Sequence, residues 1–369
     1  MRGWTGTLFA IGLLLAGTVS AHKPITSKYT YTEDVYPIVV RQCGACHSPG
    51  GVAPMSLLTY DEARPWAESI RLELASGHMP PWFGDPGVAE LKDSHKLSPR
   101  DLDVVLTWVT GGTPRGPEIA APAGAAKSGG QNSSWRRGRP DLTLAMPMAF
   151  TLPAGKAEDT REFVLETARD RDRFISAADL LPGNPAIVHD AIVFIRNATA
   201  DRVVATWLPG STPVTAGTGV GFLWRAGEQL GVRMHYKKTW KFENKAAADR
   251  STVGLYLLKT RGREVRSIDI PPAGIVIDED AQALAVVVAG RSGAPGGAGL
   301  GDIGDVLIEA LRPDGSRVPV IGFGARAGWD QRYWLATPMT IGKGTRLEVK
   351  GANAASSALR LSIDVVRPS

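Results

Sequence analysis

The sequence predicts a multidomain protein in which a small all-α domain precedes two all-β domains of the antiparallel sandwich type. The chain has 369 residues, more than one hydrophobic core usually fills. Helical periodicity is confined to the part before about residue 114, whereas short β-branched runs between glycines and prolines follow residue 140. With 43% apolar and 21% charged residues, the composition is that of a globular protein. We expect the all-α domain at 22–113, after a separate N-terminal segment, 1–21. The two all-β domains are expected at 141–262 and 263–369, after a connecting segment, 114–140.

Residues 1–21 have the pattern of a secretory signal peptide. Arg2 gives a positive start, LFAIGLLLAG is apolar but short for a spanning helix, and VSA offers small residues for cleavage. An uncleaved anchor is the alternative. Cleavage after Ala21 would leave an N-terminal His22, whose amine and ring together could chelate copper. No later window is apolar enough to cross a membrane, so we expect a periplasmic or otherwise exported protein, with no transmembrane segment in the mature chain.

Both cysteines of the chain lie in the short motif CGACH. Cys43 and Cys46 are followed at once by His47, and Cys-x-x-Cys-His is the attachment sequence of c-type haem. The thiols would form two thioethers, and the histidine would be the proximal iron ligand. A thiol redox pair and a structural zinc site are the alternatives, but the zinc site would lack further cysteine ligands. We expect one covalent haem c, in agreement with export.

A sixth iron ligand is expected from a separate segment that reaches the haem face opposite His47. Met55 is too close to His47 in the sequence to cross a haem. Met79, in GHMPPWFGD, follows an intervening amphipathic helix and is the better candidate. His78 is its competitor, and a haem with two histidine ligands would have the lower reduction potential.

Two segments around these residues have helical patterns. The first is DEARPWAESIRLELASG, at 61–77, and the second is SPRDLDVVLTWVTGG, which begins at Ser98-Pro99 and ends at two glycines. Together they predict a small helical domain over about residues 28–114. His95 lies in a polar loop before the second helix, where we expect it to be exposed to solvent.

The front of the chain resembles a known haem c domain. EDVYPIVVRQCGACHSPGGVAPMSLLTYDEARPW, MPPW and LSPRDLDVVLTWVTGGTPRG are similar to the haem c domain that begins a class of large exported bacterial proteins. The resemblance implies that the methionine of MPPW, Met79 here, is the distal haem ligand. In that class the haem domain is commonly followed by a region similar to the copper type II, ascorbate-dependent monooxygenases, such as peptidylglycine alpha-hydroxylating monooxygenase.

Residues 114–140 read as a linker, because they are rich in proline, glycine and small polar residues. The linker could wrap over a domain, and Trp135 is the residue we expect to anchor it. Strand patterns follow, and a shift near KTRGRE divides them into two β-domains. RPDGS has the composition of a hairpin turn. The strand-like segments are DLTLAMPMAFTLPAG, EDTREFVLET, AIVHDAIVFIRN, EQLGVRMHYKKTWKF, STVGLYLLKT, REVRSIDIPPAGIVIDED, ALAVVVAG, GDVLIEALRPDGSRVPVIGF, QRYWLATPMTIGKGTRLEVKG and ALRLSIDVV.

These β-domains resemble the two-lobed jelly-roll core of the copper monooxygenases. NPAIVHDAIVFI, WLPG, RAGEQLGVRMHYKKT and GWDQRYWLATPMTIGKGTRLEVKG match landmarks of that family in the same order. The family implies two copper sites: an adjacent His-His pair plus a later histidine in the first lobe, and a His-x-His pair plus a methionine in the second. The first site retains His189 and His235, but Asp190 replaces the second histidine of the pair.

The second copper site departs from the family completely. The segment expected to hold His-x-His reads AVVVAGRSGAPGGAG, and no histidine follows His235. Since imidazole is the usual copper ligand in such sites, the oxygen-binding centre cannot be assembled there. We therefore expect an electron-transfer protein rather than a monooxygenase.

His189 and His235 occupy mid-strand positions, where a facing pair could hold a remnant copper or zinc ion. The alternative is two half-buried histidines bonded to the backbone or to each other. Asp190 would point to the opposite face of a regular strand, so it could be a third ligand only at a β-bulge.

Three functions remain open. The chain could be a haem c electron carrier on a β-scaffold that has lost catalysis and serves docking or assembly. It could be a copper enzyme with an altered site, using His22, His189 and His235, or a structural subunit of a larger membrane redox complex. The expected partner is a redox protein, such as a membrane-bound respiratory or photosynthetic complex. The charge of +5 is small and no Lys/Arg run occurs, so nucleic-acid binding is not expected.

Overall fold

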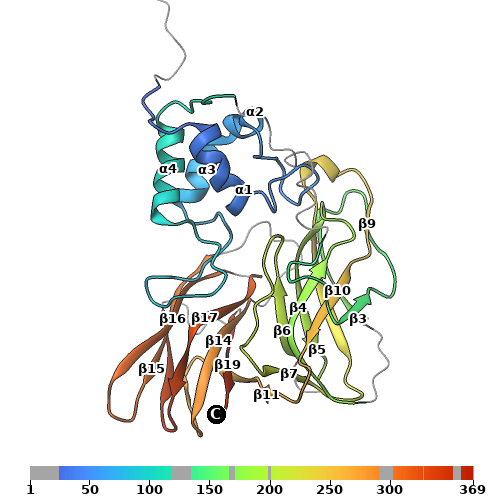
Figure 1. The fold of residues 1–369 in the computed structure, drawn as a ribbon, viewed down its shortest axis with the longest axis vertical. Helices are drawn as coiled ribbons and strands as arrows, with labels where there is room; N and C mark the ends of the chain where they lie inside the picture. Colours follow the sequence, from blue (N-terminus) through green and yellow to red (C-terminus); the bar gives the residue numbers. More distant parts are fainter. Residues whose placement is uncertain are drawn as a thin grey trace, which may run out of the picture.

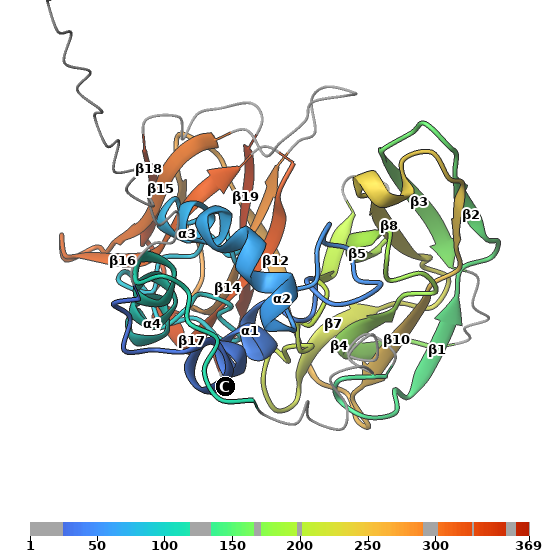
Figure 2. The same cartoon turned by 90° about the horizontal axis from the view of Figure 1, so that it is seen from above.

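The described part of the chain is mostly β-sheet, with few and short helices. The computed structural model describes residues 25–118, 134–165, 171–197, 201–290, 302–326, 328–351 and 359–368. The predicted signal segment, His22, most of the predicted linker and the glycine-rich run after residue 290 lie outside these residues. The helices gather at one end of the molecule, above two groups of strands (Figure 1). Seen from above, the two groups of strands lie side by side (Figure 2).

The helical part has a small core of its own, in which Trp108 is fully buried. Both predicted helical segments are helical. The Ser98 hydroxyl accepts a hydrogen bond from the backbone N–H of Asp101 at 3.0 Å, which satisfies a free donor at the helix start. The elements are a π-helical turn, Tyr31–Val35, then α1 (Tyr36–Gln42), α2 (Tyr60–Ala63), the 3₁₀ turn Arg64–Trp66, α3 (Ala67–Ala75) and α4 (Pro99–Thr110).

The first sandwich has two main sheets, with strand orders β1-β10-β4-β7-β11 and β3-β8-β5-β6, and the small pair β2-β9. Apart from the parallel pair of β7 with β11, its strands pair antiparallel. The strands are β1 (Leu142–Ala145), β2 (Phe150–Leu152), β3 (Glu158–Leu165), β4 (Arg173–Leu181), β5 (Val188–Ile195), β6 (Arg202–Trp207), β7 (Val220–Trp224), β8 (Leu230–Lys237), β9 (Ala247–Asp249), β10 (Thr252–Leu257) and β11 (Arg263–Glu264).

The second sandwich packs two antiparallel four-stranded sheets, with orders β12-β19-β14-β17 and β13-β18-β15-β16. RPDGS joins β15 to β16 as the predicted hairpin, in which Gly315 has the positive φ of 82° that favours glycine. The strands are β12 (Arg266–Ile270), β13 (Ile275–Val276), β14 (Ala281–Gly290), β15 (Asp302–Leu311), β16 (Arg317–Arg326), β17 (Asp330–Ile341), β18 (Arg346–Lys350) and β19 (Leu359–Val366).

A buried ion pair lies between the two sandwiches. The Arg332 side chain is 1% exposed and its Nε lies 2.7 Å from Oδ2 of Asp364, which is 0% exposed. The other Arg332 nitrogens donate to the carbonyl oxygens of Val204, at 2.5 Å, and Val203, at 2.6 Å, in β6 of the first sandwich. Each of the three guanidinium nitrogens therefore has a hydrogen-bond partner, although the side chain is almost fully buried.

The end of the predicted linker packs on the first sandwich. A Cβ atom at Gly254 of β10 would lie 2.7 Å from the ring of Trp135, so the indole rests directly on that strand. The backbone N–H of Arg136 also donates to the Asp179 carboxylate at 3.1 Å. Trp135 thus packs this end of the predicted linker against the first sandwich.

Residues 82–93, which we call the strap, leave the helical part and join the second sandwich. Trp82 and Leu91 belong to the core of that sandwich, with 6% and 8% exposure. From the sequence we expect the strap in the helical domain, because hydrophobic runs do not reveal which core a loop residue enters. Among the described helices, none is both long and apolar enough to cross a membrane.

The ion pair gives a stability prediction. Asp364→Asn leaves the Arg332 charge buried without its partner, so we expect the free energy of unfolding to fall by about 3–5 kcal/mol. Arg360→Ala is the matched control on the same strand: its bond to Asp269, at 2.9 Å, is exposed and should contribute less than about 1 kcal/mol. Urea unfolding of both variants measures the difference, and equal losses would contradict the role assigned to the buried pair.

Candidate functional site

The motif CGACH forms a tight turn at the end of α1. The backbone N–H groups of Cys46 and His47 donate to the carbonyl oxygen of Cys43, at 3.1 and 2.8 Å. Cys43 and Cys46 carry free, half-buried thiols. A Cβ atom at Gly51 would lie 2.3 Å from the Cys46 carbonyl oxygen, so the loop can close over the motif only with glycine there.

The protonation of the two thiols distinguishes the possible uses of the motif. Burial raises the pKa of Cys43 and of Cys46 to about 12. A reactive redox pair requires a thiolate, which is found where the thiol pKa is lowered. The surroundings of Cys43 and Cys46 therefore do not favour a thioredoxin-like redox pair.

His47 has the hydrogen bond expected of a metal-binding histidine. Its Nδ1 lies 3.1 Å from the carbonyl oxygen of Met55 and must donate to it, because a carbonyl only accepts. Nε2 then keeps its lone pair, and burial lowers the pKa of His47, which favours the neutral ring. A bond from the second ring nitrogen to a carbonyl is the usual orientation device for histidine ligands. These residues fit haem c, with two thiols and one oriented imidazole in a single turn.

Met79 follows α3 in the chain. Its backbone N–H donates to the carbonyl oxygen of Glu73 at 3.3 Å, and its side chain is 43% exposed. His78, the competing ligand, is exposed and lies 3.3 Å from the Glu73 carboxylate. The expectation for His95 is wrong: its side chain is only 25% exposed, because the ring packs edge-on against Trp82 at 5.5 Å.

A second group of metal-ligand residues lies on β5 and β8. The pairing of these strands shifts between Val188 and Asp190, so that His189 is the extra residue of a β-bulge. Asp190 is the direct partner of His235 across the sheet. The bulge brings His189 and Asp190 to the same side of the strand, which a regular strand would not do. Asp190 therefore joins the two histidines that the sequence singles out.

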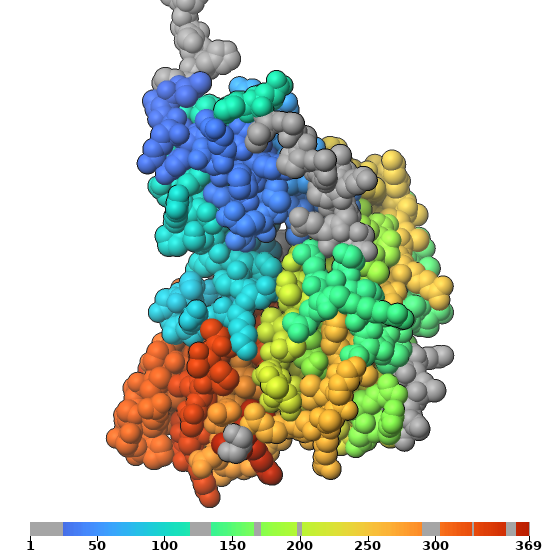
Figure 3. All heavy atoms as spheres, viewed as in Figure 1, coloured from blue at the N-terminus to red at the C-terminus, as the bar shows by residue number. Residues whose placement is uncertain are grey.

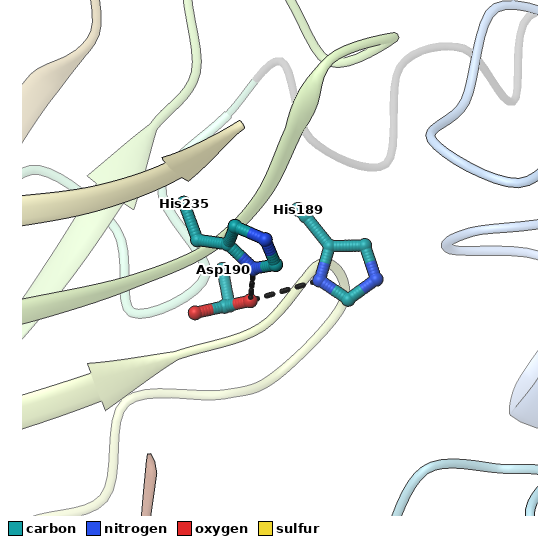
Figure 4. Close-up of side chains that lie close together, drawn as sticks. All are labelled: His189, Asp190 and His235. Carbon is teal, nitrogen blue, oxygen red and sulfur yellow. Dashed lines mark hydrogen bonds and ion pairs between the residues drawn. The ribbon is translucent and has the colours of Figure 1, made fainter. Parts of the chain in front are cut away.

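Both histidine rings point toward one carboxylate oxygen of Asp190 (Figure 4). Oδ2 of Asp190 lies 2.8 Å from Nδ1 of His189 and 2.6 Å from Nδ1 of His235. One ligand atom from each residue lies within 4.8 Å of the other two. Nε2 of His235 is 2.8 Å from Oε1 of Glu158, on the neighbouring strand β3.

Two carboxylates hold a proton on His235. Burial opposes the charged ring, but the bonds to Asp190 and Glu158 outweigh it and raise the pKa of His235 to about 9. Burial also opposes the Asp190 carboxylate, yet the two histidines hold the pKa of Asp190 well below its usual range. Without a metal, Asp190 and His235 therefore form an ion pair, and His189 bonds the same carboxylate oxygen.

The donor set does not match the three imidazoles that the copper monooxygenase resemblance implies for this site. Two imidazoles and a carboxylate are the ligands of the facial triad that binds non-haem Fe(II), and they also suit zinc. Glu158 would orient His235 from the second ring nitrogen, as acidic residues often do at metal sites. The geometry thus permits a divalent metal here, and the mixed donor set suits iron or zinc as well as copper.

A small pocket lies where the strap meets both sandwiches. It has a volume of about 40 Å³, which is room for a few water molecules rather than for an organic substrate. Among the described residues, neither the indole N–H of Trp82 nor Nε2 of His95 has a hydrogen-bond partner, although Nε2 lies 3.6 Å from the Asp93 carboxylate. Both residues line the pocket, so water bound there could satisfy them.

Comparison with known proteins gives no family. No family model matches the chain, and no curated protein matches its sequence. Among solved structures, N-glycanase F is similar over 62% of this chain and 96% of its own, with 8% identity and a TM-score of 0.29. An alpha-L-fucosidase described as putative, from Bacteroides ovatus, covers 73% of this chain and 48% of its own, with 10% identity and a TM-score of 0.21. Similarity at this level supports no functional argument.

The charge on His235 predicts how stability depends on pH. Because the folded pKa is raised above the ordinary 6.5, the stabilisation is complete below about pH 6.5 and is lost as pH rises through about 9. In chelator-treated protein we expect a loss on the order of 3 kcal/mol between about pH 6 and pH 10. Asp190→Asn should lower the pKa of His235, measured by NMR titration, and flatten this profile. An unchanged titration in that variant would contradict the assignment.

Proposed function

We propose that the protein is an exported c-type cytochrome with one covalent haem, which transfers single electrons. The observation that carries the proposal is the hydrogen bond from Nδ1 of His47 to the carbonyl oxygen of Met55, beside two cysteines in the same turn. It gives the ring the tautomer and orientation that an axial ligand needs. A thiol redox pair would require a thiolate, which burial of Cys43 and Cys46 disfavours.

The residues have distinct roles in this proposal. Cys43 and Cys46 supply the thioethers, His47 the proximal ligand and Met79 the distal ligand. Bound haem would supply an iron that changes between two oxidation states. The carbonyl oxygen of Met55 accepts from Nδ1 of His47, the ring nitrogen that would not bind iron, so Met55 would stay on the His47 side of a bound haem. The exposed Met79 side chain is an apolar group that a haem would cover.

The β-scaffold is proposed to serve docking or assembly. The oxygen-binding copper site has no histidine ligands in the sequence, so monooxygenase chemistry is not proposed. The expected partner is a redox protein, such as a membrane-bound respiratory or photosynthetic complex, in the periplasm or another exported location. A structural subunit of such a complex is the alternative, and fixed stoichiometry on co-purification would distinguish it.

A second candidate function, divalent metal binding, is favoured by the bulge that adds Asp190 to His189 and His235. Copper, which the resemblance implies, and zinc, iron or cobalt are the ions to compare.

The haem proposal predicts the effect of removing the distal ligand. Met79→Ala should keep the covalent haem and its Soret band, lose the long-wavelength band of methionine-ligated ferric haem, and lower the midpoint potential, because methionine ligation raises it. His78→Ala, next in the chain, is the control and should change neither. An unchanged spectrum and potential in Met79→Ala would refute the ligand assignment, and a colourless wild type, produced with a haem c maturation system, would refute the proposal.

The metal proposal predicts a separate binding event. Wild-type protein should bind about one divalent ion per chain, measured by calorimetry and elemental analysis after dialysis. Asp190→Ala should abolish this binding, and Glu158→Gln should weaken it about 10–100-fold, because Glu158 only orients His235. His95→Ala, away from the cluster, should bind like the wild type. Equal binding by wild type and Asp190→Ala would exclude this site.

A further inference from the structure

We infer that the second sandwich holds Met79 in position through the strap, and that Trp82 is the positioning residue. The inference rests on the proposed haem function and extends it, because the β-scaffold would position the distal haem ligand in addition to serving docking. It is carried by the way residues 82–93 enter the second sandwich (Figure 3). In that view the strap, in cyan, lies between the helical part and the strands of the second sandwich.

Trp82 is buried in the core of the second sandwich and does not belong to the core of the helical part. Its ring stands edge-on to Tyr333 of β17, with centroids 5.1 Å apart and planes at 83°. Tyr333 is itself 0% exposed and stacks on Phe323 of β16. A buried indole contributes several kcal/mol to stability, so Trp82 is a strong anchor for the chain beside it.

The strap backbone is bonded to two strands of the same sandwich. Beside Trp82, the N–H of Gly324 donates to the carbonyl oxygen of Phe83 at 2.9 Å, and the N–H of Asp85 donates to that of Gly322 at 2.7 Å. At the far end, the N–H of Lys92 donates to the carbonyl oxygen of Trp334 at 2.9 Å. The strap therefore extends the sheets of the second sandwich at both ends.

Met79 lies between this anchor and the helical part. Its backbone is bonded to Glu73 at the end of α3, and only Pro80 and Pro81 separate it from Trp82. Three residues span at most about 10 Å, so Met79 cannot move far from the second sandwich. Proline fixes φ and removes backbone freedom, which makes the connection stiff.

The proximal motif also rests on the scaffold, through the first sandwich. A Cβ atom at Gly210, which follows β6, would lie 2.3 Å from Cβ of Ala45, the residue between Gly44 and Cys46. The turn at Gly210 therefore packs directly against CGACH. The strap is bonded there as well, because the N–H of Thr212 donates to the Asp93 carboxylate at 3.2 Å. The CGACH turn thus contacts the first sandwich, the strap contacts both sandwiches, and the Arg332–Asp364 pair joins the two.

The test compares three full-length variants, produced with a haem c maturation system. Trp82→Ala removes the anchor, and Trp82→Phe keeps an aromatic ring in its place. Trp224→Ala is the control: it removes a buried indole of β7, in the first sandwich, which donates to the carbonyl oxygen of Glu228. The measurements are the methionine band of the ferric haem, the midpoint potential, and the affinity of the ferrous haem for carbon monoxide, which binds where Met79 has left.

We expect Trp82→Ala to retain covalent haem, weaken the methionine band, lower the potential and bind carbon monoxide about tenfold more tightly. Apparent affinity follows the fraction of molecules with an open site, so a tenfold rise in that fraction gives a tenfold change. Trp82→Phe should restore most of the wild-type behaviour. Trp224→Ala should lose stability without changing the band or the potential. A folded Trp82→Ala protein with wild-type band, potential and carbon monoxide affinity would overturn the inference.

A second pair of variants covers the case in which Trp82→Ala does not fold. A Cβ atom at Gly322 would lie 2.9 Å from the Val88 side chain of the strap, whereas the nearest neighbour of one at Gly324, on the same strand, would be the end of the Arg326 side chain, at 3.5 Å. Gly322→Ala should therefore shift the strap and weaken the methionine band, and Gly324→Ala should not. Equal spectra in the two would overturn the inference.

Failure of the proposed function gives a different result. If the wild type has no covalent haem, the haem proposal itself is wrong. If it has haem but Met79→Ala keeps the methionine band, the ligand assignment is wrong, and the inference about Trp82 is overturned with it. If Met79→Ala loses the band while Trp82→Ala keeps it, the haem proposal stands and only the positioning role is wrong.

Discussion

The buried pair of Arg332 and Asp364 is the interaction on which the arrangement of this molecule depends. A guanidinium with no access to water must be paired and hydrogen-bonded, and Arg332 meets this need only by using β6 of the first sandwich and β19 of the second. Its charge also lies over the Phe222 and Trp334 rings, at 4.7 and 5.4 Å. The two sandwiches therefore have one relative position in which this charge is satisfied.

This fixed pair of sandwiches explains how a small helical part can hold the loops that carry the proposed haem ligands. Its own core is small, and the segments at CGACH and Met79 have little regular structure. Trp82 and the turn at Gly210 connect these segments to much larger cores. The loops of the helical part are therefore held in place by contacts with the two sandwiches, where burial of apolar side chains offsets the entropy cost of ordering a loop.

The cluster on β5 shows how a single extra residue changes the chemistry of a site. In a regular strand, His189 and Asp190 would face opposite sides of the sheet, and His235 would have one imidazole as its neighbour. The bulge adds a carboxylate to that neighbourhood, with Glu158 beyond His235. The result is a mixed nitrogen and oxygen donor set, which differs from an imidazole-only site in charge and in the metals it prefers.

The sequence by itself determined the order of helical and β parts, the helix limits at Ser98, the hairpin at RPDGS and the CGACH motif, because these depend on local periodicity, turn residues and spacing. It gave no sign of strands β4, β6 and β7 as separate elements, nor of the bulge at His189, since register depends on the neighbouring strand. Only the tertiary structure decided that Trp82 enters the second core and that His95 is half-buried. A loop residue's partner is chosen by packing between distant segments, and no local pattern encodes that choice.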